Sequence, residues 1–452
     1  MVPLQSDGTA NDASTKICMR YLIAALALGC LAPVTASAQK PPPAVAPVAA
    51  DADPAVRAQA EALLPVLKGG PGYDTVFAPA FRQAVPLGQW QALTAQLRDS
   101  LGAPQRIATL TPKGRYAAQL LVGYERGTAT MLIAIDPAAP HPITGLRITG
   151  TTRSDDSAAT IEKDLSALPG TTRLGIYALD GATPTPVLAV RDTQPAPLGS
   201  AFKLWVLAEA ARQVAAGLHR WDEVVPVAAP SLPSGILQAW PAGTPVTLQT
   251  LATLMISISD NTAADTLIGV LGRKEVDAMA ARFGATGPVL TTREAFAIKA
   301  DPTRIAAWKG ADAAGRRALL AAQGRAMAAQ RIDPLMFSSG PIANDSVEWF
   351  ASPRDMARLL AHLRDAGPVV RGIMGINPGI DPATAARFRY VGFKGGSEPG
   401  VITLNLLAQA RDGRWYAVVG DWHRPDAGVD DAAFVALVSR ALSLVATPAT
   451  RP

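Results

Sequence analysis

The spacing of hydrophobic positions changes from helical to alternating between residues 55 and 150. Apolar residues recur at intervals of three and four from Ala55 to Leu67, and again over Leu87–Leu101. Alternating runs then predict strands at Tyr116–Glu125, Thr128–Ile135 and Ile143–Ile148. Because helices followed by a strand meander are typical of compact α+β units, we expect a small α+β domain over residues 55–150.

A second domain is predicted over residues 165–448, with strands at both of its ends. Strand-like runs occur at Leu174–Leu179, Val187–Arg191, Phe388–Phe393, Val401–Ala410 and Trp415–Asp421. Asp412 and Gly413, between the last two runs, form a strong hairpin signal. A long helical centre separates the two groups of strands, and a helix over Asp430–Val445 closes the domain. This order predicts one antiparallel sheet built from both ends of the domain and flanked by helices, an α/β (α+β) architecture.

The first 38 residues have the pattern of a signal peptide. A basic residue precedes a short apolar run, Leu22–Ala32, and Ala36–Ala38 provide a cleavage signal of small residues. The run is too short for a permanent membrane span. Residues 39–54 are rich in Pro and Ala and are expected to form a linker. We therefore expect a periplasmic or secreted protein, with lipidation at Cys30 as the alternative and with Met1 or Met19 as the start.

The composition argues against several classes of function. The formal charge of +5 is spread without a basic cluster, which disfavours nucleic-acid binding. Both cysteines, Cys18 and Cys30, lie in the removable segment, so a mature chain has no thiol nucleophile and no disulfide. No paired spacing of His, Asp and Glu indicates a metal site, and we expect no cofactor. Gly-x-Ser-x-Gly is absent, which disfavours a Ser-His-Asp triad.

A Ser-x-x-Lys sequence opens one of the predicted helices. Ser200 and Lys203 are followed by apolar residues at helical spacing as far as Gly217. Lys203 therefore lies one turn after Ser200 on the same face. A serine hydroxyl needs a base to become a nucleophile, and a lysine can be that base when its surroundings lower its pKa. The alternative interpretation is an ordinary N-cap serine.

A second sequence, Ser259-Asp260-Asn261, follows an apolar helix. Taken alone it is typical of an N-cap before the next helix. In a serine hydrolase, Ser259 would relay a proton to the leaving nitrogen. Asn261 would orient the substrate and the lysine.

A third sequence, Lys394-Gly395-Gly396-Ser397, ends a predicted strand. Glycines such as Gly396 let a substrate backbone lie along the strand edge, and Lys394 would attract a carboxylate. The N–H groups of Ser397 and Ser200 would together form an oxyanion hole. Glu398 follows directly, and an acid so close to Lys394 would weaken the recognition of carboxylated substrates.

Together, the three sequences resemble the signature of class A β-lactamases and penicillin-binding proteins. The resemblance covers Thr172 to Val445 and implies a serine β-lactamase/transpeptidase-like fold with an acyl-enzyme at Ser200. The two-domain layout and the run Lys394–Gly400 resemble a subgroup that includes the β-lactamase-like protein of the clavulanic-acid cluster. The first domain resembles the cone-shaped fold of the nuclear-transport-factor and ketosteroid-isomerase group in its order of elements.

Glu294 is the candidate for activating water during deacylation. It lies 35 residues after Ser259, where class A enzymes carry a loop glutamate, but the Leu-Asn that follows in those enzymes is missing. An ion pair with Arg293 or Arg304 is the alternative role. An extra helical stretch over Ala313–Gln330 would lie near this loop and reshape the pocket.

These residues predict a serine acyl hydrolase with a small-molecule acyl substrate. The sequence around Ser259 favours hydrolysis of β-lactams, whereas the incomplete glutamate motif favours a D-Ala-D-Ala peptidase or an esterase for small esters. A non-catalytic sensor of β-lactams or peptidoglycan would need no proton relay. The acyl donor, the role of the first domain and the oligomeric state stay open.

Overall fold

The computed structural model describes residues 52–181, 183–231, 233–241 and 243–446. The predicted signal peptide, residues 1–38, and most of the predicted linker lie outside these ranges. Within them, no helix combines the length and the apolar character that a bilayer crossing needs.

Residues 54–153 form helices followed by a four-stranded antiparallel sheet. The elements are α1 (Pro54–Leu67), α2 (Tyr73–Val76), α3 (Pro79–Ala84), α4 (Leu87–Leu101), β1 (Pro104–Gly114), β2 (Ala117–Tyr124), β3 (Gly127–Ile135) and β4 (Ile143–Arg153). The sheet order is β1-β2-β3-β4, and the buried residues between Val56 and Ile143 form one hydrophobic cluster. Strand β1 was not predicted, because most of its side chains are exposed and its apolar residues do not alternate regularly. The boundaries at 55–150 and 165–448, and the likeness to the ketosteroid-isomerase group, stay predictions.

The second region contains the longer helices and the larger sheet. Its strands are β5 (Thr171–Ala178), β6 (Thr185–Val190), β7 (Ala196–Pro197), β8 (Val224–Pro226), β9 (Pro245–Thr247), β10 (Phe350–Ala351), β11 (Tyr390–Glu398), β12 (Val401–Gln409) and β13 (Trp415–His423). Its helices are α5 (Ala158–Ala167), α6 (Lys203–Ala215), α7 (Leu248–Ser257), α8 (Asn261–Leu271), α9 (Arg273–Arg282), α10 (Thr292–Lys299), α11 (Pro302–Gly310), α12 (Ala313–Ala329), α13 (Pro353–Asp365), α14 (Pro368–Met374), α15 (Pro382–Ala385) and α16 (Asp431–Ser443). Short 3-10 turns are η1 (Gly199–Phe202), η2 (Leu237–Ala239) and η3 (Pro334–Ser338).

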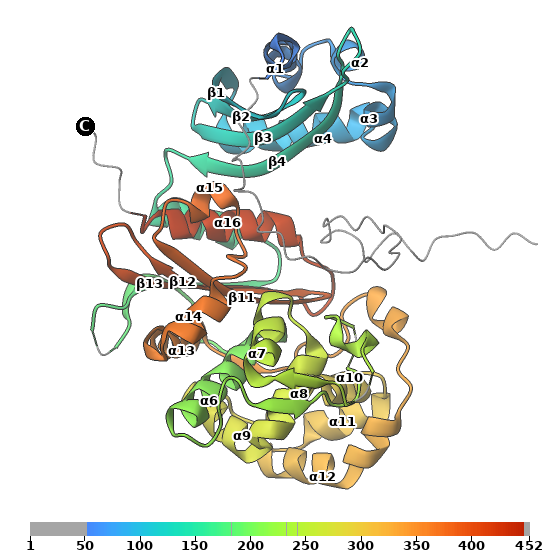
Figure 1. Ribbon diagram of the computed structural model, residues 1–452, viewed down its shortest axis with the longest axis vertical. Coiled ribbons are helices and arrows are strands. Elements are labelled where there is room, and N and C mark those ends of the chain that lie inside the picture. Colours follow the sequence, from blue (N-terminus) through green and yellow to red (C-terminus); the bar gives the residue numbers. More distant parts are fainter. Residues whose placement is uncertain (1–51, 182, 232, 242, 447–452) are drawn as a thin grey trace, which may run out of the picture. The chain divides into compact units, whose positions relative to one another are not determined.

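A five-stranded antiparallel sheet joins the two ends of this region (Figure 1). Its order is β11-β12-β13-β5-β6, and Trp422 of β13 lies opposite Thr172 of β5. The turn between β12 and β13 contains Gly413 with a φ of 98°, a conformation that glycine adopts without strain. The antiparallel sheet predicted from both ends of the domain is therefore confirmed.

Both faces of the sheet are covered by helices. Strand β12 shows this by alternation, because Leu404 and Leu406 belong to the cluster shared with α5 and α16, whereas Leu407 belongs to the opposite cluster. The opposite cluster contains the buried apolar residues of α6, α7, α8 and α13. A strand buried on both faces has a continuous apolar sequence, as β12 does.

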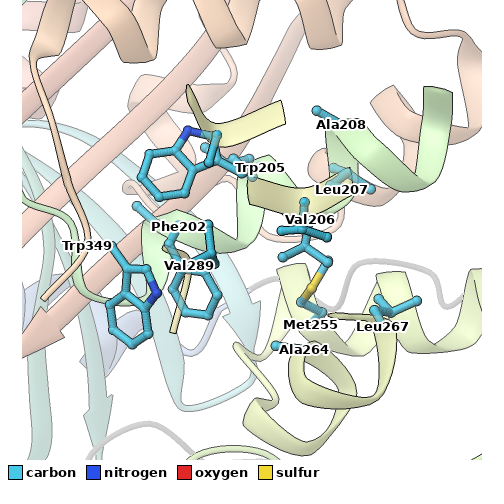
Figure 2. Close-up of a cluster of buried hydrophobic side chains, with 14 of the residues drawn as sticks. Phe202, Trp205, Val206, Leu207, Ala208, Met255, Ala264, Leu267, Val289 and Trp349 are labelled. Atoms are coloured by element: carbon cyan, nitrogen blue, oxygen red, sulfur yellow. The ribbon is translucent and has the colours of Figure 1, made fainter. Parts of the chain in front are cut away.

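Helix α6 packs into this opposite cluster, and its side chains are buried on almost every side. At its start, the Phe202 ring stacks on Trp349 with centroids 4.0 Å apart and planes 7° apart, and Val206 and Met255 belong to the same cluster (Figure 2). A helix that is apolar on every side belongs in a core. Lys203, in the first turn of α6, is therefore held in a closely packed and largely apolar surrounding.

Candidate active site

Ser200 lies in a tight turn that leads into α6. Residues Gly199–Phe202 form the 3-10 turn η1, and the α-helix begins at Lys203 instead of at Ser200 as predicted. The N–H of Lys203 donates to Ser200 O, the shorter bonding that often opens a helix. Gly199 has a φ of 46°, which a residue with a side chain rarely adopts. Ser200 is thereby placed at the N-terminal end of α6, where the helix dipole favours negative charge.

Lys203 is fully buried and lies against the Ser200 hydroxyl. Its Nζ is 3.2 Å from Ser200 Oγ, 2.6 Å from Asn261 Oδ1, 2.7 Å from Ser259 O and 3.1 Å from Ser259 Oγ. Burial first, and then the positive charge of Lys394, hold the pKa of Lys203 well below its ordinary value of 10.5. A neutral amine has a lone pair that can accept a proton, so Lys203 has the position and the basicity required of a general base.

Ser259 and Asn261 reach the site from the junction between α7 and α8. Ser259 has a φ of 59°, in the left-handed region. Asp260 between them is fully buried and caps α8, since its carboxylate accepts the N–H of Ala263 at 2.8 Å and two further backbone N–H groups. The helix-cap interpretation therefore holds for Asp260, while its two neighbours contact Lys203.

Lys394 brings a second amine to the site from β11. Its Nζ lies 3.1 Å from Ser259 Oγ, and burial lowers its pKa to about 7. Since Ser259 Oγ is also 3.1 Å from Lys203 Nζ, one hydroxyl joins the two amines. The structure thus brings together Ser200, Lys203, Ser259 and Lys394 from three separate segments of the chain.

Strand β11 passes directly against the backbone of the Ser200 turn. A Cβ added at Gly396 would lie 2.0 Å from Leu198 O and 2.6 Å from Ser200 N. A Cβ added at Gly199 would lie 3.2 Å from Ser397 N. Only glycine permits two backbones to approach this closely. The approach brings the backbone nitrogens of Ser200 and Ser397, the predicted donors of the oxyanion hole, into one small region.

Glu294 lies at the start of α10, where other groups engage its carboxylate. Both of its oxygens accept from Arg273 Nη2 at 2.8 Å, and Oε2 also accepts the N–H of Thr291 at 2.8 Å. The Thr291 hydroxyl in turn accepts the N–H of Glu294, which completes a capping box. Among the interactions of the described residues, none joins Glu294 to Ser200 or Lys203. Its role in deacylation stays a prediction.

The ion-pair partner of Glu294 is Arg273, so the suggested partners Arg293 and Arg304 were wrong. Arg293 donates to backbone carbonyls at the end of α12, including that of Ala328. Arg304 pairs within its own helix region with Asp301. Sequence proximity alone could not separate these three arginines.

A largely buried cluster of three ionisable residues adjoins the same turn. Lys299 Nζ lies 2.9 Å from Glu348 Oε1 and 2.7 Å from Glu398 Oε1. The second oxygen of Glu348 accepts the N–H of Gly199 at 2.9 Å. Glu398 is therefore directed to Lys299, and burial followed by the charge of Glu348 raises the pKa of Glu398 to about 8. No motif marks Lys299 or Glu348, and the acid after Ser397 was the only signal of this cluster in the sequence.

A cavity of about 270 Å³ lies between the segment at Pro233 and the end of α12. Its walls are Pro233, Arg293, Phe296, Ala329, Gln330, Arg331, Ile332 and Phe337. Pro233 precedes Ser234, whose hydroxyl donates to Ser259 O at 2.7 Å. Phe296 lies one turn before Lys299 on α10. The predicted extra helix is α12, and the segment that follows it supplies one wall of the cavity.

Comparisons with known proteins found one matching family and several similar solved structures. Residues 157–371 match the profile of a family described as the Beta-lactamase enzyme family. A variant of PBP-A, solved as an acyl-enzyme complex with penicillin G, is 20% identical with a TM-score of 0.44, over 64% of this chain and 94% of that one. A β-lactamase from Sphaerobacter thermophilus is 19% identical with a TM-score of 0.45, over 64% and 97% of the two chains. No curated protein matches the chain.

The antiparallel sheet flanked by helices, together with the family match over residues 157–371, gives the chain a β-lactamase-like serine hydrolase fold. The matched residues include Ser200, Lys203 and Ser259. Lys394 and the rest of β11 lie beyond the matched residues. The contact of Lys394 with Ser259 is therefore seen in the structure and not in the family match.

Proposed function

We propose that the protein is a serine acyl hydrolase that opens β-lactams through an acyl-enzyme at Ser200, in the manner of class A β-lactamases. The proposal is carried by Lys203, a buried amine of lowered pKa that lies 3.2 Å from Ser200 Oγ. Buried lysines that only stabilise a fold are usually paired with a carboxylate. The hydrogen bonds of Lys203 within the described residues go to neutral oxygens instead.

The reaction begins when Ser200 Oγ passes its proton to the neutral amine of Lys203 and attacks the carbonyl carbon of the substrate. The N–H groups of Ser200 and Ser397 stabilise the negative oxygen of the tetrahedral intermediate. When the carbon–nitrogen bond breaks, Ser259 Oγ donates a proton to the leaving nitrogen and is reprotonated from Lys203 or Lys394, each 3.1 Å away. Water then hydrolyses the ester and releases the acid.

A second candidate is a penicillin-binding-protein-like peptidase or a small-ester esterase. The observation that favours it is the engagement of Glu294 by Arg273 and by the start of α10. An enzyme without a positioned base for water would deacylate slowly after reaction with a β-lactam.

Time-resolved intact-protein mass spectrometry tests the proposal. The chain is mixed with benzylpenicillin, with a chromogenic cephalosporin and with p-nitrophenyl acetate. Rapid cephalosporin turnover supports a β-lactamase, a persistent penicillin adduct supports the peptidase or a sensor, and ester turnover alone supports an esterase. Ser200→Ala is expected to abolish every adduct while the protein keeps its melting temperature. A folded Ser200→Ala protein that still turns over these substrates would refute the assignment.

We also propose that residues 1–38 direct export to the periplasm or the medium. The support is the short apolar run before small residues at Ala36 and Ala38. Fractionation of cells that produce the full chain, with mass determination of the mature N-terminus, tests this. Recovery of the uncleaved chain in the cytoplasm would contradict it.

A further inference from the structure

Lys299 is connected to both backbone segments that would form the oxyanion hole. One connection passes through Glu348, which binds Lys299 Nζ at 2.9 Å with one oxygen and the N–H of Gly199 at 2.9 Å with the other. Gly199 directly precedes Ser200. The other connection is Glu398, which binds Lys299 Nζ at 2.7 Å and directly follows Ser397. The ammonium of Lys299 therefore links Gly199, which precedes Ser200, to Glu398, which follows Ser397.

The first connection is closely packed. Glu348 is only 7% exposed, and the next residue, Trp349, stacks on Phe202 of η1. The N–H of Leu198 donates to Trp349 O at 2.8 Å, and β10 continues this pairing with β7. A movement of Glu348 would therefore move the turn that carries Ser200.

The charge of Lys299 also matters for the reaction. A carboxylate bonded to Gly199 adds negative charge close to the place where the oxyanion develops, and this would oppose the reaction. Lys299 is 3% exposed, and its ammonium cancels the charge of Glu348 at short range. Buried ion pairs often stabilise a fold no better than apolar residues of the same size, so stability alone is a weak reason for this cluster.

We propose that Lys299 is a positioning residue for the oxyanion hole: through Glu348 and Glu398 it holds the N–H groups of Ser200 and Ser397 in place, and it neutralises the carboxylate beside them. This inference rests on the proposed function. It adds to the site a residue on α10 that touches neither the nucleophile nor its base in the described structure.

The test separates binding from acylation in Lys299→Met. Rates of acylation by benzylpenicillin and p-nitrophenyl acetate are measured over a range of concentrations. We expect the maximal acylation rate to fall at least about tenfold, by analogy with the loss of an oxyanion-hole donor. The concentration for half-maximal acylation should change by less than about threefold, because ground-state binding does not use the developing charge. An unchanged maximal rate in a folded variant would overturn the proposal, as would a loss confined to binding.

Arg173→Met is the matched control. Arg173 forms a buried ion pair with Asp421 at 2.6 Å between β5 and β13, two or more strands from β11, and its bonds in the described residues include neither Glu348 nor Glu398. The Arg173→Met variant should have a lower melting temperature than the wild-type chain but the same maximal acylation rate. If both variants slow acylation equally, the effect is general loosening and the inference fails.

Two Glu398 variants keep the test decisive if Lys299→Met does not fold. Glu398→Gln keeps an oxygen that can accept from Lys299, whereas Glu398→Leu removes it. We expect the glutamine variant to acylate clearly faster than the leucine variant. Equal maximal rates in the two variants would contradict the role of this connection.

Hydrogen–deuterium exchange distinguishes a failure of this inference from a failure of the proposed function. If the wild-type chain is acylated by neither probe, the proposed function is wrong. Amide exchange in the peptide covering residues 196–203 still reports on the turn. It should be faster in Lys299→Met than in Arg173→Met, and equal exchange would overturn the positioning role.

Discussion

Lys203 donates to the side-chain oxygen of Asn261 at 2.6 Å, so an amide and not a carboxylate orients the buried amine. An amide oxygen fixes the position of the amine without a negative charge that would raise the lysine pKa. The same contact therefore positions the base and leaves it able to lose its proton.

Asn261→Asp tests this relationship with a side chain of almost the same shape. The carboxylate would raise the pKa of Lys203 by about 1–3 units, and each unit by which that pKa exceeds the pH lowers the neutral fraction about tenfold. We expect acylation at pH 7 to fall by about tenfold or more and to recover as the pH rises. The measurement is the acylation rate between pH 6 and 10. A rate loss that does not recover at high pH would show that the amide serves substrate binding alone.

Lys203→Arg is expected to be as damaging as Lys203→Ala. Arginine keeps the positive charge but cannot be deprotonated in a protein, so it cannot accept the proton of Ser200. Loss of a general base lowers rates by about 10²–10⁴-fold. Mass-spectrometric acylation rates of the two variants check this. Near-normal acylation by the arginine variant would make Lys203 an electrostatic group only.

The lowered pKa of Lys394 predicts that the pH dependence of the rate differs between charged and neutral substrates. Acylation should rise with pH as Lys203 loses its proton, since its pKa is depressed by burial. Attraction of a carboxylate by Lys394 should fall as the pH rises above about 7, where burial places its pKa. We therefore expect kcat/KM for benzylpenicillin to have a falling limb above about pH 7, and kcat/KM for p-nitrophenyl acetate, which has no carboxylate, to have none.

The control is Lys394→Arg, which stays charged at high pH. It should shift the falling limb for benzylpenicillin upward and leave the ester profile unchanged in shape. Subtraction of the rate with Ser200→Ala removes spontaneous ester hydrolysis. A falling limb that persists unchanged in the arginine variant would assign it to another group.

Much of the region that contains the five-stranded sheet could be predicted because its sequence signals are local. The pair Asp412 and Gly413 predicts the β12–β13 hairpin through turn geometry, and Ser-x-x-Lys at helical spacing predicts that Ser200 and Lys203 share a face. Two elements with weaker sequence signals were not predicted. The turn η1 replaces the first turn of α6, and the largely exposed strand β1 lacks regular alternation.

The parts that could not be predicted depend on residues far apart in the chain. Lys299 is 49 residues from Glu348 and 99 from Glu398, and nothing in the local sequence of any of them indicates the other two. The need for glycine at Gly396 arises in the same way. Its neighbour is Leu198 O, which only the folded backbone brings near.

Gly396→Ala should impair the site by steric displacement alone. The added methyl would lie 2.0 Å from Leu198 O and 2.6 Å from Ser200 N, so one of the two backbones must move. We expect a loss of about 1–3 kcal/mol in the free energy of unfolding and an acylation rate at least about tenfold lower. Urea unfolding and mass-spectrometric acylation measure the two effects.

Gly269→Ala is the matched control for that substitution. Gly269 lies within α8, and a Cβ there would meet no atom within 4 Å. Alanine should stabilise the helix by up to about 1 kcal/mol and leave acylation unchanged. If Gly396→Ala behaved like this control, the backbone of β11 would not set the geometry around Ser200.

Glu294→Ala separates a structural glutamate from a deacylating one. Loss of the capping box and of the ion pair with Arg273 should lower the free energy of unfolding by about 1 kcal/mol or more. Arg273→Met breaks the same ion pair and leaves the carboxylate, so it controls for lost stability. Because the carboxylate is already bonded to Arg273 and to the N–H of Thr291, we expect both variants to release the penicillin adduct at the wild-type rate. The half-life of the adduct is followed by mass spectrometry. An adduct that persists in Glu294→Ala but not in Arg273→Met would instead give Glu294 the deacylation role that its distance from Ser259 suggests.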